Sequence, residues 1–160
     1  MKLSKICVPV ALQRYVPFPP VALRQRELAM VLALHYKAEL HFLTVDGPVT
    51  LLPHLEETAS KLKRLIEPLA QFDTLKVSIA HREGKPSKEI RTFVDEIAAD
   101  AVIIGSHSKR SALDVGVGST ASALRHDMKA TVIMIRPTTD ETAQAKELMI
   151  PAYPFVFPYG

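Results

Sequence analysis

Residues 105–119, with the sequence GSHSKRSALDVGVGS, hold the residue types that bind an anion through backbone N–H groups. They contain three of the chain's six glycines, four serines and the pair Lys109-Arg110. The apolar run Ala101-Val102-Ile103-Ile104 comes before them and helix-forming residues follow. A glycine at the end of a strand lets a ligand approach the backbone, and a helix N-terminus offers unpaired N–H groups to a phosphate. An ordinary strand-to-helix connection also favours Gly and Ser, so both interpretations stand at this point.

Gly105 and Ser119 are the two positions that a phosphate site in this stretch would use first. Gly105 ends a predicted buried strand, and ligands of open α/β sheets bind beyond the carboxyl ends of the strands. Ser119 follows Gly118 where the next helix is expected to begin, which makes it a natural N-cap. The positive charges of Lys109 and Arg110 would favour a phosphate there.

The rest of the chain alternates between strand and helix patterns that would position this stretch. Apolar or alternating runs predict strands over residues 6–10, 40–45, 75–79, 101–104 and 131–135. Helical periodicity predicts helices over 21–37, from about 54, after the turn 83–87, and from about Ser119. This alternation predicts an α/β domain with a largely parallel sheet.

Two details of the predicted helices can be checked against a structure. The apolar stripe of the first helix is expected to consist of Leu28, Val31, Leu32 and Tyr36. The second helix contains Pro68, which should end or kink it because proline lacks the N–H that a helix needs.

Composition excludes several classes of protein. The chain has 160 residues, 48% hydrophobic and 23% charged, as expected for one globular domain. No apolar run approaches the ~18 residues of a membrane span. A net charge of +3 is too small to indicate nucleic-acid binding. The single Cys7 falls in a predicted buried strand and is expected to be an inert core thiol, which fits a cytoplasmic location.

The sequence contains no motif for catalysis or for a metal site. Four serines crowd the glycine stretch, but there is no G-x-S-x-G elbow and no P-loop motif. The six histidines are scattered, with no pair at the i, i+4 spacing of a helical zinc site. We therefore predict no catalytic residue and no metal ligand. Slow ATP hydrolysis or autophosphorylation of a nearby serine is an alternative.

The glycine stretch and its flanks resemble the universal stress proteins. Nucleotide-binding members of that family carry G-x-x-G, nine residues and then G-[ST] after the fourth strand. Here Gly105-Ser106-His107-Ser108 is followed by nine residues and Gly118-Ser119. The segments "ADAVIIGSHS", "KATVIMIRP", "KAELHFLTV" and "EGKPSKEI" are similar to the family as well. The resemblance covers about residues 3–137.

The resemblance implies a fold, a ligand and a partner. The fold is a five-stranded parallel sheet in the order 3-2-1-4-5 between helices, the three-layer adenine-nucleotide alpha-hydrolase-like architecture. The partner is a second copy of the chain, joined through the last strand. One branch of the family binds ATP or AMP, and Mg²⁺ arriving with ATP would be held mainly by phosphates and water. The matching positions are Gly105, Gly118 and Ser119 for ribose and phosphates, and Val45 for the base.

Two positions depart from the family pattern. Ser108 stands in place of the second glycine, where a positive φ would strain a serine by ~1 kcal/mol or more. Ala11 stands where ATP-binding relatives usually carry an aspartate that reads the adenine. Either Tyr15 or Phe18 of the lengthened loop 11–20 stacks on the base instead, or the pocket is altered or filled. The alternative function is a nucleotide-free stress adaptor that acts through protein–protein contacts.

Residues 151–160, PAYPFVFPYG, carry four of the chain's ten aromatic residues at alternate positions. Such alternation predicts an extended segment with one apolar face, which should dock on another surface. We therefore divide the chain into a universal stress protein-like domain, residues 1–137, and an extension, residues 138–160. The extension is predicted to cross the dimer interface; its own sheet edge and another protein are the alternative docking sites.

Overall fold

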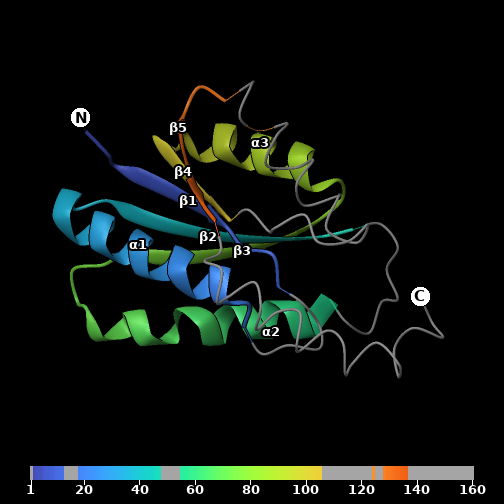
Figure 1. Ribbon diagram of the computed structural model, residues 1–160, viewed down its shortest axis with the longest axis horizontal. Helices are drawn as coiled ribbons and strands as arrows, with labels where there is room; N and C mark the ends of the chain where they lie inside the picture. Colours follow the sequence, from blue (N-terminus) through green and yellow to red (C-terminus); the bar gives the residue numbers. More distant parts are fainter. Residues whose placement is uncertain (1, 13–17, 48–54, 106–123, 125–127, 137–160) are drawn as a thin grey trace.

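The computed structural model describes residues 2–12, 18–47, 55–105, 124 and 128–136. In these ranges the chain forms five strands, three α-helices and one 3₁₀ helix, η2 (Figure 1). The strands are β1 (Lys5–Pro9), β2 (Glu39–Asp46), β3 (Val77–Glu83), β4 (Ala101–Gly105) and β5 (Thr131–Ile135). The helices are α1 (Pro20–Tyr36), α2 (Leu55–Ile66), η2 (Glu67–Gln71) and α3 (Pro86–Ile97).

The strands form one parallel sheet in the order β3-β2-β1-β4-β5. Helices α1 and α2 cover one face of the sheet and α3 covers the other (Figure 1). The predicted strand order and three-layer architecture are therefore confirmed. Because the order reverses between β1 and β4, the carboxyl ends of these two strands form the switch point at which such folds bind ligands.

The central strands β1 and β4 are buried, and for β4 the continuous apolar run predicted coverage on both faces. The run Thr131–Ile135 predicts the same for β5, but this strand is at the edge of the described sheet and of its residues Ile135 alone is buried. Cys7 of β1 is 0% exposed, and its burial raises the pKa of the thiol to about 12. A thiol that is buried and held protonated is a poor nucleophile. The prediction that Cys7 is part of the core is confirmed.

Helix α1 packs on the sheet through a different face from the one predicted. Its buried residues are Val21, Ala22, Gln25, Ala29 and Ala33. Of the expected stripe, Val31 is 55% exposed, and Leu28, Leu32 and Tyr36 are only partly buried at the sides of the helix. The small alanines let the helix backbone approach the sheet, and the larger side chains fill the space on either side.

Pro68 ends α2 as predicted, because the α-helix stops at Ile66 and a 3₁₀ helix follows. The predicted bounds of the next strand are wrong: β3 runs from Val77 to Glu83 rather than over 75–79. Leu75 donates its N–H to the carbonyl of Phe72 at 3.1 Å, which keeps it in the turn after η2. Pairing with the long strand β2 extends β3 as far as Glu83.

Several predictions fall outside the described residues. Among them are Tyr15, the extension 138–160 and most of the helix expected near Ser119. Leu124 is the described residue of that segment; it is helical and 0% exposed, and it packs on the α3 side of the sheet. The domain boundary at residue 137 stays a prediction. No helix in the described part of the chain is long and apolar enough to cross a membrane.

Candidate functional site

The ladder between β1 and β4 ends at the pair Cys7 and Val102, and Pro9 follows two residues later at the carboxyl edge of the sheet. Val10 donates its N–H to the Leu43 carbonyl of β2 at 2.8 Å. Successive residues of a strand face opposite neighbours, so position 9 faces β4. Pro9 has no N–H to donate to the carbonyl of Ile103 on β4. A buried carbonyl at the switch point therefore needs another donor.

The side-chain amide of Gln25 supplies that donor. Its Nε2 donates to the Ile103 carbonyl at 3.0 Å and to the Pro9 carbonyl at 2.7 Å. Gln25 is 2% exposed, and its neighbours on the inner face of α1 are apolar. An unsatisfied buried carbonyl is unfavourable by ~1–3 kcal/mol, so this amide both completes the ladder and joins α1 to the two central strands. Sequence reasoning missed Gln25, whose signal is a polar residue in line with the alanines of α1.

Gly105 ends β4 as predicted, and helix α1 occupies the direction of its absent side chain. A Cβ at Gly105 would lie 2.4 Å from Cγ1 of Val21 and 2.8 Å from Oε1 of Gln25. The glycine therefore makes room for the helix. A ligand at this position would have to contact the Gly105 backbone from another direction.

Val45, the predicted contact for a base, lies next to the end of β2. Its side chain is partly buried and packs on the α3 side of the sheet. The following residue, Asp46, has Oδ2 2.6 Å from Nε2 of His81 on β3, and the two side chains are 24% and 25% exposed. Sequence reasoning missed this pair because it depends on the β2–β3 register. It puts a carboxylate at the same edge of the sheet as Gly105.

The structure brings Val45 and Gly105 to one edge of the sheet, with β1 between them. Phe18, a candidate for stacking on a base, packs against the core on the α1–α2 side. Gly118, Ser119 and Ser108 lie outside the described residues. Their positions relative to Gly105 stay predictions.

The described part of this edge has mixed suitability for an adenine nucleotide. The methyl group of Ala11 cannot accept a hydrogen bond from an adenine amino group, and α1 fills the side-chain direction of Gly105. The Asp46 carboxylate and the backbone groups that end β2 and β4 do have suitable chemistry. Among the described residues, no group of three or more His, Cys, Asp or Glu side chains could hold a metal ion.

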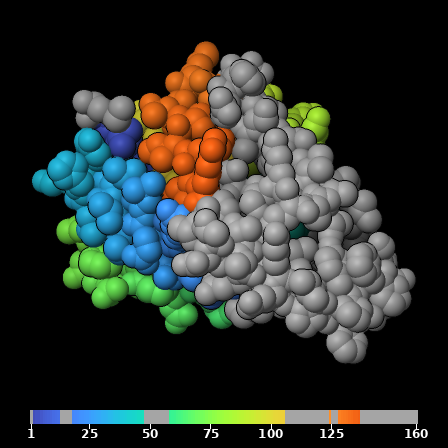
Figure 2. Space-filling view, viewed as in Figure 1, coloured from blue at the N-terminus to red at the C-terminus, as the bar shows by residue number. Residues whose placement is uncertain are grey.

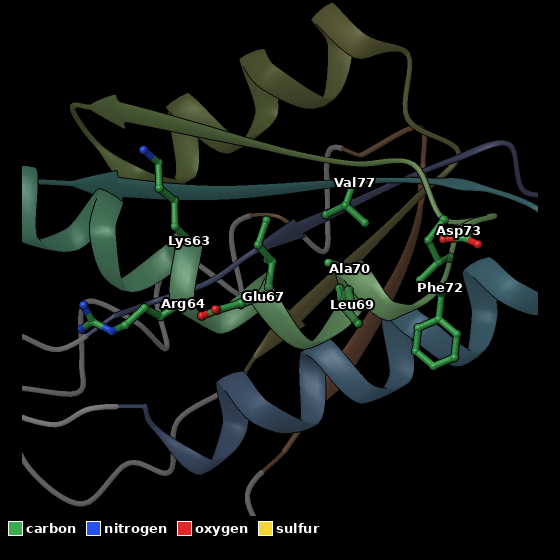
Figure 3. A pocket seen from close by; sticks show the side chains of 10 residues that line it. Lys63, Arg64, Glu67, Leu69, Ala70, Phe72, Asp73 and Val77 are labelled. Carbon is green, nitrogen blue, oxygen red and sulfur yellow. The ribbon is translucent and has the colours of Figure 1, made fainter.

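A hollow of about 570 Å³ lies elsewhere, between α2, η2 and the start of β3 (Figure 3). Apolar side chains including Leu69, Phe72 and Val77 line it. Exposed charges of both signs surround them, with Lys63 and Arg64 on α2 and Glu67 and Asp73 on or just after η2 (Figure 3). Val77 is the first residue of β3, so this hollow is at the amino edge of the sheet, opposite Gly105.

An open parallel sheet whose order reverses between β1 and β4, with a glycine at the end of β4, defines a doubly wound α/β protein. The model of the universal stress protein family matches residues 5–136, and the chain belongs to this family. No curated protein matches the sequence.

Solved structures of universal stress proteins share the fold. One from Archaeoglobus fulgidus DSM 4304 is 20% identical to this chain, with a TM-score of 0.58. The match covers 86% of this chain and 45% of the Archaeoglobus chain, so this chain spans less than half of that protein's length. Another from Archaeoglobus fulgidus, solved in complex with dAMP, is 19% identical with a TM-score of 0.63. The match covers 84% of this chain and 99% of the other. A family protein from Arabidopsis thaliana with AMP bound is 15% identical with a TM-score of 0.62 and coverages of 87% and 95%.

Proposed function

We propose that this chain binds an adenine nucleotide, ATP or AMP, as a regulatory ligand of the stress response. The observation that carries the proposal is the position of Gly105, which ends β4 at the switch point and begins the family-like glycine stretch. Relatives of the same fold have been solved with dAMP and with AMP.

In the proposed complex, the nucleotide lies along the carboxyl edge of the sheet. Gly105, Gly118 and Ser119 hold the ribose and phosphates through backbone N–H groups and the serine hydroxyl. Val45 contacts the base. The Asp46 carboxylate, on the other face of β2 at the same edge, is an acceptor in place of the aspartate that ATP-binding relatives carry at the position of Ala11. Mg²⁺ accompanies ATP and is held by phosphates and water.

The proposed active form is a cytoplasmic homodimer joined through β5. This strand is at the edge of the sheet and pairs with β4 on one side. Arg24 of α1 donates from Nη1 to the carbonyl of Arg136 at 2.5 Å, which holds the end of β5 against the helix. The extension 138–160 follows Arg136 closely in the sequence, and in this proposal it crosses to the partner.

Nucleotide binding is tested by thermal unfolding of the purified protein with ATP, AMP and GTP. At a ligand concentration of 100 Kd, binding should stabilise the fold by about 2.7 kcal/mol, and GTP should have less effect than ATP. Gly118→Val should abolish the ATP effect. Ser60→Val, at an exposed position of α2, is the control for the added side chain. Acid extraction followed by absorbance of the extract detects nucleotide that is bound on purification.

A nucleotide-free adaptor is the second candidate function. It is favoured by Ala11, which lacks the carboxylate of ATP-binding relatives, and by the packing of α1 against Gly105. An adaptor would show no thermal shift with any nucleotide and no adenine in the extract. That result would exclude nucleotide binding and favour an adaptor that acts through protein–protein contacts on the surface of the dimer.

A further inference from the structure

Ser78, His41 and Glu39 form a hydrogen-bonded series on strands β2 and β3. The Ser78 Oγ lies 2.8 Å from Nδ1 of His41, and the His41 Nε2 lies 3.3 Å from Oε1 of Glu39. Their side chains are on the α3 side of the sheet, as are those of Leu43 and Ala80 further along the same strands. The β2–β3 register places Ser78 directly opposite His41.

The serine hydroxyl is exposed, and the histidine is more shielded from solvent than the carboxylate. Ser78 is exposed to solvent, so a reagent can reach its hydroxyl. The His41 side chain is 17% exposed and the Glu39 side chain is 42% exposed. Because the imidazole is shielded from water, its ring nitrogen can accept the hydroxyl proton without a competing water molecule. The carboxylate on its other side orients the ring.

The two contacts of His41 select one tautomer of its neutral ring. When Nε2 carries the hydrogen, it donates to the Glu39 carboxylate, and the lone pair of Nδ1 faces the Ser78 hydroxyl. That is the tautomer in which the ring can accept the serine proton. The arrangement follows the general pattern of a nucleophile, a base within hydrogen-bond distance and a third group that orients the base.

A backbone N–H next to Ser78 is available at the free edge of β3. Leu40 donates its N–H to the Lys76 carbonyl at 2.8 Å, so the even-numbered residues of β3 face β2. Ile79 therefore directs its N–H away from β2, at an edge that pairs with no other strand of the described sheet. The sheet edge beside Ser78 is therefore polar and open to a small reagent within the described part of the chain.

We propose that Ser78 is a nucleophilic serine that accepts an acyl group from small activated carboxylic esters, with His41 as its base and Glu39 as a positioning residue. In the reaction the Ser78 Oγ bonds to the ester carbonyl carbon, while its proton moves to Nδ1 of His41. The bond from that carbon to the leaving alkoxide or phenolate breaks, and the imidazolium returns its proton to the leaving group or to water. The activity is separate from nucleotide binding at the carboxyl edge.

The test is incubation of the full chain with p-nitrophenyl acetate, with mass spectrometry of the peptides at successive times. The expected result is acetylation at Ser78, faster than at Ser60, an exposed serine of α2 that serves as the internal control. His41→Gln should slow acetylation of Ser78 about 100-fold, the lower range of a general base contribution. Ser60→Ala should leave the Ser78 rate unchanged. A fluorophosphonate probe should label wild type and not Ser78→Ala.

The Glu39 variants separate positioning from a purely structural role. Glu39→Gln keeps an oxygen that can accept from Nε2, so it should retain more Ser78 reactivity than Glu39→Leu at equal thermal stability. Ser78→Cys keeps a nucleophile beside the same base, so it tests the role of His41 even if another variant fails to fold. The thiol of this variant should be acetylated faster when position 41 is His than when it is Gln. Equal acetylation of Ser78 and Ser60, or a Ser78 rate unchanged by His41→Gln, would overturn the proposal.

Discussion

At the scale of single residues, Gly105 is placed where β4 and α1 leave no space for a methyl group. Gly105→Ala would put Cβ 2.4 Å from Cγ1 of Val21, a β-branched side chain in a helix that cannot rotate away easily. Overpacking of this kind destabilises by ~1–3 kcal/mol. We expect Gly105→Ala to lose stability in that range, measured by urea unfolding.

Two further variants show whether the helix contact is the cause. Val21→Ala in the Gly105→Ala background should recover part of the loss, because it removes the nearest atom. Gly47→Ala should change the free energy of unfolding by less than ~0.5 kcal/mol, since no atom of the described residues lies within 4 Å of a Cβ there. A neutral Gly105→Ala would mean that α1 does not pack against β4 as described.

Replacing Gln25 should lower the free energy of unfolding by more than Gly105→Ala does, because one amide donates to two buried carbonyls. Gln25→Met has similar length and no donor, so the carbonyls of Pro9 and Ile103 would both lose their hydrogen bond. At ~1–3 kcal/mol for each of the two unsatisfied carbonyls, we expect the free energy of unfolding to fall by about 2–6 kcal/mol in urea unfolding. Gln25→Glu adds a test by pH. Its carboxyl can donate only when protonated, so Gln25→Glu should approach wild-type stability as the pH falls, whereas the deficit of Gln25→Met should persist.

At the scale of elements, Asp100 joins the amino edges of the central strands. Its Oδ2 accepts from the N–H groups of Ser4 at 2.7 Å and Lys5 at 2.9 Å, just where β1 begins. The backbone N–H of Asp100 donates to the Lys5 carbonyl at 2.8 Å, and its carbonyl accepts from Thr131 of β5 at 3.0 Å. The hydrogen bonds from Ser4 and Lys5, in that order, lower the pKa of the Asp100 carboxyl.

A lowered pKa in the folded state gives this carboxylate a pH-dependent contribution to stability. The contribution is fully present above the unfolded pKa of about 3.9 and is lost as the pH falls through the lower folded pKa. Asp100→Asn should therefore be less stable than wild type by about 1 kcal/mol at pH 7, and the difference should shrink towards pH 2. Urea unfolding at several pH values measures it. Asp95→Asn, which removes an exposed carboxylate of α3, is the control for the change in net charge.

The elements that could be predicted from sequence are those whose burial follows one regular pattern from end to end. β1 and β4 are covered on both faces, so their sequences are continuously apolar, and they were placed to within a residue. β3 and β5 are both edge strands of the described sheet, and the apolar run of β5 marks its ends correctly. The ends of β3 are set by pairing with the long strand β2, which its own alternating sequence does not show. The inner face of α1 was misassigned because the side chains that touch the sheet are alanines, which hydrophobic periodicity counts less than Leu or Val.

The site was harder to predict than the fold because its contacts depend on pairing between distant segments. Gly105 was recognised from its place after an apolar run. Gln25 could not be, since its role depends on the missing N–H of Pro9 and on the distance between β1 and β4. The same holds for His41, which meets Ser78 across 37 positions of sequence through strand register.

At the scale of the whole molecule, the surface around β5 is the proposed contact between two copies. Val31 and Leu34 of α1 are exposed at 55% and 37%, and Figure 2 shows the surface of α1 next to that of β5. An edge strand, and exposed apolar side chains on a helix that adjoins it, are expected to be covered in the functional assembly. Deletion of 151–160 should weaken the dimer if this segment crosses the interface. Sedimentation equilibrium measures the change, and an unchanged association constant would exclude the crossing arm.

The edge itself can be blocked with one residue. Thr131 directs its N–H towards β4, so Val132 directs its own N–H to the free edge of β5. Proline is tolerated at such a position because no ladder bond within the sheet is lost, but it prevents another strand from pairing there. Val132→Pro should therefore shift the protein to monomer in sedimentation while keeping it folded. Val77→Pro blocks the opposite edge at β3 and should leave the dimer intact. Dimers that persist with Val132→Pro and dissociate with Val77→Pro would place the contact at β3 instead.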